Sequence, residues 1–383
     1  MRGPAAGGYV RGVFSLVRVL GVLGVLGVAA VAGLLVAGTG AVAVAQQAPE
    51  SEGGQPAVSL SWQLTPTGRT AEFRGLSAVS STVAWLGGQD GSVLRTTDAG
   101  ATWAAVGPPA ASSPEFRDVE ATSDRHAVIL SVGEGTDSRI YVTDDGGASW
   151  SLAFQNQDPK AFYDCMAFSS PQRGLAVSDP VDGVFRLQET LDGGHTWSYV
   201  DPAGMPAARA NEFAFATSGT CLTAGHGETT SLASGGDNPQ RVLLSRDGGH
   251  TWSTSDAPLA VGPSAGIFSV RFRDRDRGIA VGGNLANPTS EEGNAAWSTD
   301  GGLTWKPADI RPSGYRSGSA WLPGERDVAV AVGPGGSDVT ADAGRTWSAF
   351  DTGSFDSVEC ASDGGCWASG AQGRVARLVV GHD

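Results

Sequence analysis

Six polar side chains lie at the start of the same kind of short segment in successive stretches of the chain. The segments read FRG, FRD, FYD, NEF, YRS and FDS, with GIF (Ile267) as a seventh, and the polar residues are Arg74, Arg117, Tyr163, Glu212, Arg316 and Asp356. Arginines grouped around one opening can hold a carboxylate or a phosphate through paired hydrogen bonds. The alternative is that the three arginines pair with Glu212 and Asp356, so that the group only lines the opening.

An eight-residue pattern, [ST]xDxGx[ST]W, recurs six times and shows which elements position these side chains. Its tryptophans are separated by 47, 47, 55, 53 and 42 residues, a spacing that suits one four-stranded propeller blade per repeat. The copies, called boxes below, are TTDAGATW (96–103), TDDGGASW (143–150), TLDGGHTW (190–197), SRDGGHTW (245–252), STDGGLTW (298–305) and TADAGRTW (340–347).

Each box has the composition of a tight turn. Its aspartate can accept backbone N–H bonds within the turn, and its glycine can adopt the positive φ that a Cβ penalises. The tryptophan that follows enters a strand and can cover the edge of a blade. We therefore expect a structural role for Asp98, Asp145, Asp192, Asp247, Asp300 and Asp342.

Short β-rich runs bounded by glycine, aspartate and proline lie between the boxes, and none shows a 3.6-residue period. They predict an all-β chain with one domain over residues 57–381. The last repeat, 355–380, supplies three strands but no box and no fourth strand. The orphan segment SLSWQLTP (59–66) can supply that strand, which would close a seven-bladed β-propeller and remove its open edges.

The first 56 residues have a different composition. Arg2, Arg11 and Arg18 precede an uncharged apolar stretch that runs from Val19 to Ala45 and ends in AVA. This pattern predicts a signal peptide over 1–45, with an uncleaved membrane anchor as the alternative, and a flexible tether over 46–56. We expect a secreted or periplasmic protein of the cell envelope.

Charge and cysteine positions limit the partners and the covalent links. The formal net charge of −14 argues against nucleic acid and anionic membrane surfaces as partners. Cys360 and Cys366 flank a turn and predict a disulfide in an oxidising compartment, whereas Cys165 and Cys221 are expected to be buried thiols.

Motifs for bound metals and cofactors are weak. The five histidines show no metal-ligand spacing, and the carboxylates of SDPVDG (178–183) do not make a complete Ca²⁺ loop. The chain has no GxSxG elbow and no dinucleotide fingerprint before a helix. We expect no metal, no cofactor and a monomer.

The boxes resemble the Asp-box, or BNR, repeats of sialidases and related propellers. The fuller pattern, with FRGL (73–76), GSVLRTTDAGATW (91–103) and GAQGRVARL (370–378), resembles the photosystem II stability and assembly factor family, especially its exported bacterial relatives. The resemblance covers nearly the whole mature chain. It implies a non-enzymatic binding or assembly propeller that engages a protein, its chain terminus or an anionic ligand through an arginine patch, for which Arg74, Arg117 and Arg316 are the candidates.

The resemblance to sialidases implies an alternative function, glycoside hydrolysis. Sialidases use three arginines for the substrate carboxylate, a tyrosine activated by a glutamate, and an aspartate as acid/base. Tyr163, Glu212 and Asp356 are the candidates by residue type. The RIP motif of that family is absent and its catalytic domains have six blades, so the binding function is favoured.

Overall fold

The computed structural model describes residues 58–109 and 114–382. The predicted signal peptide and tether, at 1–56, lie outside the described residues. Within the described ranges, no helix is both long and apolar enough to cross a membrane.

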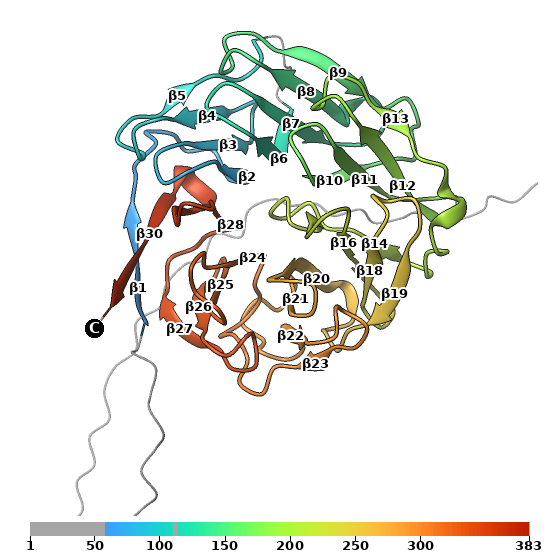
Figure 1. Ribbon diagram of the computed structural model, residues 1–383, viewed down its shortest axis with the longest axis vertical. Coiled ribbons are helices and arrows are strands. Elements are labelled where there is room, and N and C mark those ends of the chain that lie inside the picture. The colour runs from blue at the N-terminus through green and yellow to red at the C-terminus, as the bar shows by residue number, and fades with distance from the viewer. Residues whose placement is uncertain (1–57, 110–113, 383) are drawn as a thin grey trace, which may run out of the picture. The chain divides into compact units, whose positions relative to one another are not determined.

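Strands in the described part of the chain form seven antiparallel sheets. Figure 1 shows them as blades around a centre, with β2, β6, β10, β20, β24 and β28 innermost. The first three blades consist of β2 (Phe73–Ala78), β3 (Ala84–Gly88), β4 (Val93–Thr96) and β5 (Ala104–Ala105); β6 (Glu115–Ala121), β7 (Ala127–Val132), β8 (Arg139–Thr143) and β9 (Ser151–Gln155); and β10 (Tyr163–Phe168), β11 (Gly174–Val181), β12 (Val184–Thr190) and β13 (Ser198–Tyr199).

The later blades include one enlarged sheet. The fourth blade consists of β15 (Leu222–Ala224), β16 (Thr230–Ala233), β18 (Arg241–Ser245) and β19 (Ser253–Asp256). The fifth consists of β20 (Gly262–Phe272), β21 (Gly278–Asn284), β22 (Ala295–Ser298) and β23 (Lys306–Pro307), extended by β14 (Glu212–Phe213) and β17 (Gly235–Gly236). The sixth consists of β24 (Gly318–Trp321), β25 (Ala329–Gly333), β26 (Gly336–Thr340) and β27 (Ser348–Asp351). Short 3₁₀ helices lie at Gly135–Asp137, Pro202–Gly204 and Ala371–Gly373.

The seventh blade joins the two ends of the ring. It consists of β28 (Ser357–Cys360), β29 (Cys366–Ser369), β30 (Val375–His382) and β1 (Val58–Leu64). β1 pairs with β30 along its whole length, in a register that runs from Val58 opposite His382 to Leu64 opposite Ala376. The predicted seven-bladed propeller, closed by the N-terminal strand, is confirmed.

Apolar side chains fill the spaces between neighbouring blades. Trp85 of the first blade packs with Phe116 and Ile129 of the second, and comparable clusters lie at the other six blade boundaries of the described ring. The boundary between the last and first blades is filled by Trp367 with Phe73. Each blade therefore buries both of its faces, which stabilises the whole ring.

The box turns share one hydrogen-bond pattern. In the fourth box, Asp247 Oδ1 accepts from Ser245 Oγ at 2.8 Å and from the Thr251 N–H at 2.9 Å, and Oδ2 accepts from Thr251 Oγ1 at 2.6 Å. The other five box aspartates accept the equivalent three bonds. Gly249, whose position is glycine in all six boxes, has a φ of 95°, which a residue without a Cβ adopts most readily.

Candidate functional site

A one-residue bulge marks the start of the innermost strands. The ladder register shifts between Phe73 and Gly75 in the first blade and between Phe116 and Asp118 in the second. Arg74 and Arg117 are the extra residues at these bulges. A bulge changes the direction of the side chain that it carries and often lies beside a functional site.

The same bulge recurs in the third, fifth, sixth and seventh blades. In the seventh, the N–H of Asp356 donates to the carbonyl of Ser369, and Ser369 is also the ladder partner of Ser357. Two residues thus lie opposite one. The residues at the bulge are Asp164, Phe268, Ser317 and Asp356 in these four blades. Arg74, Arg117 and Asp356 therefore share one position, on three consecutive blades.

The expected alignment was wrong for the other residues. Tyr163, Ile267 and Arg316 lie one position before the bulge in their blades. Glu212 belongs to β14, which extends the sheet of the fifth blade rather than beginning the inner strand of the fourth. A two-against-one bulge leaves no mark in residue type, so a one-residue shift cannot be seen in the sequence.

Arg316 does not lie exposed at an opening, as the ligand-binding prediction requires. Its side chain is fully buried, and Nε donates to Asp338 Oδ2 at 2.6 Å. The remaining nitrogens bond to Ser313 Oγ and to the carbonyl of Tyr315, each at 2.8 Å. A buried guanidinium needs this full set of partners, so Arg316 is a structural residue.

The side chains of Glu212 and Tyr163 form hydrogen bonds with separate sets of residues. Arg241 binds both oxygens of Glu212, with Nε and Nη2 each at 2.6 Å, and Ser234 donates a further bond of 2.7 Å. Gln188 donates to the hydroxyl of Tyr163 at 2.9 Å, and burial raises the pKa of that phenol. The two side chains do not form the tyrosine–glutamate pair of the glycosidase hypothesis.

Arg74 and Arg117 keep about a quarter of their side chains exposed. Each pairs with the carboxylate two residues earlier, Glu72 at 3.0 Å and Glu115 at 2.9 Å. Arg117 also donates through Nη1 to the carbonyl of Ala216 at 3.2 Å, which lies 99 residues away in the chain. We call Glu72, Arg74, Glu115, Arg117 and Asp356 the arginine mouth.

Asp356 supplies the third carboxyl group of the arginine mouth. Burial raises its pKa to about 7, although the charge of Arg74 lowers it, and Glu72 raises it further. Oδ2 of Asp356 is buried and has no hydrogen-bond partner among the described residues. Near neutral pH, the arginine mouth thus holds two guanidinium groups, two ion-paired carboxylates and a carboxyl group that gains or loses a proton.

An aromatic cluster borders the arginine mouth. Ring centroids lie 4.0 Å apart for Phe215 and Phe268 and 4.8 Å apart for Phe268 and Tyr315. The charge of Arg74 acts on the phenol of Tyr315, which places the two side chains close together. Phe213 and Leu285 pack on this cluster and are only partly buried. Partly exposed apolar side chains therefore belong to the same cluster as Tyr315, the residue that lies near Arg74.

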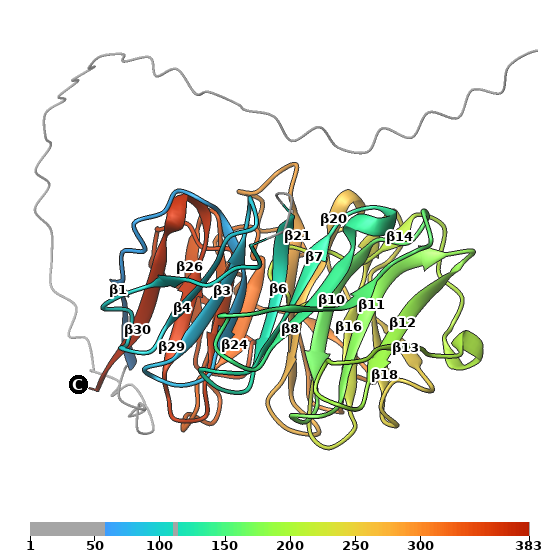
Figure 2. The ribbon, with the colours of Figure 1, turned by 90° about the horizontal axis from the view of Figure 1, so that it is seen from above.

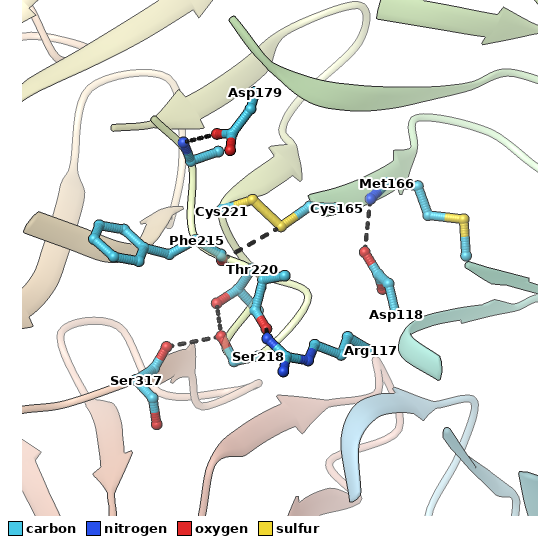
Figure 3. Close-up of a disulfide and its surroundings, with 12 residues drawn as sticks. Arg117, Asp118, Cys165, Met166, Asp179, Phe215, Ser218, Thr220, Cys221 and Ser317 are labelled. Carbon is cyan, nitrogen blue, oxygen red and sulfur yellow. Dashed lines mark hydrogen bonds between the residues drawn. A yellow bond between two sulfur atoms is a disulfide. The ribbon is translucent and has the colours of Figure 1, made fainter. Parts of the chain in front are cut away.

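A small polar cavity follows the arginine mouth along the inner strands. It is lined by Asp118, Glu120, Glu359 and Arg271, and burial raises the pKa of all three carboxyl groups. Asp118 accepts a 2.6 Å bond from the N–H of Met166, drawn in Figure 3. The sequence analysis missed this cluster, although Asp118 directly follows Arg117.

Two disulfides lie within the ring. Cys360 is joined to Cys366 across the hairpin of β28 and β29. The expectation of thiols at Cys165 and Cys221 was wrong, because a disulfide joins these residues of the third and fourth blades (Figure 3). Their Cα atoms lie 6.1 Å apart, a separation that a disulfide spans.

The carboxylates of SDPVDG (178–183) bond to the protein. Asp179 Oδ1 accepts from the N–H of Ala214 at 2.9 Å. Asp182 pairs with Lys160 at 2.9 Å and with Arg186 at 3.4 Å.

Comparisons with known proteins bear on the fold. No family model matches the chain, and no curated protein matches its sequence. The structure of YCF48 bound to D1 peptide superposes with a TM-score of 0.59 at 17% identity, covering 83% of this chain and 96% of that chain. YCF48 from Cyanidioschyzon merolae gives 0.59 at 16% identity, covering 82% and 98%. The WD40 domain of Pan2 from Neurospora crassa gives 0.53 at 11% identity, covering 81% and 89%. The chain is thus similar in fold to the YCF48 propellers, over 82–83% of its own length and nearly the full length of those chains.

Proposed function

We propose that this chain is an exported, non-enzymatic propeller that binds a protein partner by holding one of its carboxylates at the arginine mouth. The observation that carries the proposal is the placement of Arg74 and Arg117 at the same bulge of adjacent blades, each with about a quarter of its side chain exposed.

The neighbouring residues favour a peptide over a small inorganic anion. Glu72 and Glu115 already neutralise much of the arginine charge, so a free anion gains little. A peptide can add apolar contacts on Phe213 and Leu285, which pack on the same aromatic cluster as Tyr315. The YCF48 structure in complex with D1 peptide supports a peptide ligand by analogy of fold.

The glycosidase alternative loses its proposed catalytic group. Three of its six candidates, Tyr163, Glu212 and Arg316, are buried in separate hydrogen-bond networks. Only Arg74, Arg117 and Asp356 remain together, without the tyrosine–glutamate pair that the hypothesis requires as the nucleophile and its activator.

A display library of random peptides with free C-terminal carboxyl groups tests the proposal. We expect the parent chain to select carboxylate-bearing peptides, and Arg74→Gln/Arg117→Gln to bind the same peptides at least tenfold more weakly, because charge-assisted bonds contribute about 1.5–3 kcal/mol. Arg275→Gln, an exposed arginine between β20 and β21, is the matched control. Equal binding by the double variant and the parent would refute the assignment of the arginine mouth.

A further inference from the structure

Three potential metal ligands meet on turns of the second and third blades. His126 lies in the turn between β6 and β7, Asp144 directly follows β8, and His195 lies in the third box. One donor atom from each side chain lies within 4.8 Å of the other two. His126 and His195 are 69 positions apart in the sequence, which explains why sequence spacing gave no sign of a site.

Both imidazole rings face the same carboxylate. Nδ1 of His126 lies 2.8 Å from Oδ1 of Asp144, and Nε2 of His195 lies 3.5 Å from Oδ2. The ring centroids are 6.0 Å apart. Donor atoms of a tetrahedral Zn²⁺ site lie about 3.3 Å apart, since each is about 2.0–2.2 Å from the metal. Because the three atoms already lie within 4.8 Å of one another, their separations differ from this value by at most about 1.5 Å.

The propeller provides its own comparison at the next blade boundary. Gly174 pairs with Thr190 just as Ala127 pairs with Thr143, so Arg173 occupies the position of His126. A Cβ built on Gly193 would lie 3.6 Å from Nε2 of His126, and one built on Gly248 would lie 2.7 Å from Nη2 of Arg173. The two side chains thus cover equivalent turns of the next box.

The donors do not recur at that boundary. His250 has the box position of His195, but its equivalents of His126 and Asp144 are Arg173 and Leu191. Arg173 binds Glu189 at 2.9 Å and Glu228 at 2.6 Å. The fold therefore does not require two histidines and an aspartate in this place, and their coincidence points to a ligand.

We propose that His126, Asp144 and His195 bind one divalent transition-metal ion of the Zn²⁺ class. Two imidazoles and a carboxylate suit such an ion and leave a fourth position for water. All four cysteines are in disulfides, so no thiolate competes for the metal. The site lies at the opposite ends of the inner strands from the arginine mouth, and it is independent of the proposed function.

Calorimetric titration of the metal-stripped full chain with ZnCl₂ tests the proposal. We expect one equivalent to bind, and His126→Ala, His195→Ala and Asp144→Asn each to weaken binding at least tenfold. His250→Ala, an exposed histidine at the same box position, is expected to bind like the parent. Zn²⁺ should also raise the Tm of the parent and of His250→Ala but not that of His195→Ala. A ligand stabilises the folded protein only when the folded protein binds it.

Two results would overturn the site. The first is Zn²⁺ binding by His126→Ala and His195→Ala as tight as that of the parent, which would place the metal elsewhere. The second is a parent chain that binds no Zn²⁺ below about millimolar concentration, which would leave Asp144 as a surface ion-pair partner only. If His126→Ala fails to fold, His195→Ala decides, because its side chain is 44% exposed and supports little packing.

Discussion

Arg74, Arg117 and Asp356 share a backbone position at which the ladder skips one residue. This bulge position determines which side chains lie close together, whereas the neighbours of each side chain determine its protonation state. The two arginines each have a carboxylate two residues earlier, but the residue two before Asp356 is Ser354. Asp356 therefore lacks a partner on its own strand, and its protonation responds to burial and to Arg74.

Asp356 should make the stability of the ring depend on pH. Its pKa of about 7 lies above the ordinary 3.8, so its contribution is fully present below about pH 3.8 and is lost as pH rises through about 7. We expect Asp356→Asn to gain stability relative to the parent from pH 4 to pH 8, on the order of 4 kcal/mol in the free energy of unfolding. Urea unfolding at a series of pH values measures this, and parallel curves for the two proteins would contradict the assignment.

The pKa values of the box aspartates are lowered, in contrast to the raised pKa of Asp356. Desolvation raises the pKa of Asp247, but the hydrogen bonds from Thr251 and Ser245 outweigh this effect and lower the pKa to about 2. Asp247→Ala removes the acceptor of these bonds and should cost about 1–3 kcal/mol of stability while leaving the affinity for a selected peptide unchanged. Urea unfolding and peptide binding, measured well below the Tm, test the two parts. A loss of affinity at unchanged stability would mean that the box contacts the ligand.

At the scale of elements, the strand β1 has the largest role because it comes from the other end of the chain. Its seven residues pair with β30, and Leu60 packs into the cluster between the sixth and seventh blades. Trp62 also donates from Nε1 to Ser337 Oγ of the sixth blade at 2.9 Å. The strand thus completes one blade and contacts its neighbour.

Deletion of residues 57–68 should therefore open the ring. The deletion exposes the edge of β30 and part of the core beside it, so we expect the whole propeller to lose cooperative unfolding rather than one blade alone. Calorimetry of the truncated chain measures this. A truncated protein that melts like the parent would show that β1 does not close the ring.

The two disulfides should differ in their contribution to stability. Cys165–Cys221 closes a segment of 56 residues and joins two blades, whereas Cys360–Cys366 closes 6 residues within one hairpin. Chain entropy predicts about 4 kcal/mol for the first and about 2 kcal/mol for the second. We expect Cys165→Ser/Cys221→Ser to lower the Tm more than the matched pair Cys360→Ser/Cys366→Ser. The reverse order would show that the inter-blade link does not limit unfolding.

At the scale of the whole molecule, repeat spacing was enough to predict the fold. The boxes recur at blade length, and SLSWQLTP supplied the missing strand. The site was harder to predict, because alignment by residue type misplaced Tyr163, Glu212 and Arg316. A bulge depends on hydrogen-bond partners in the neighbouring strand, and the meeting of His126 with His195 depends on how adjacent blades stack. Neither relation is local in the sequence.

The central claim is that the arginine mouth binds a carboxylate of the partner, and a double-mutant cycle tests it most directly. One selected peptide is compared as its free acid and its C-terminal amide, on the parent and on Arg74→Gln/Arg117→Gln. We predict that amidation weakens binding to the parent at least tenfold but has little further effect on the double variant. Additive losses of affinity, in which amidation weakens peptide binding equally for both proteins, would contradict the claim.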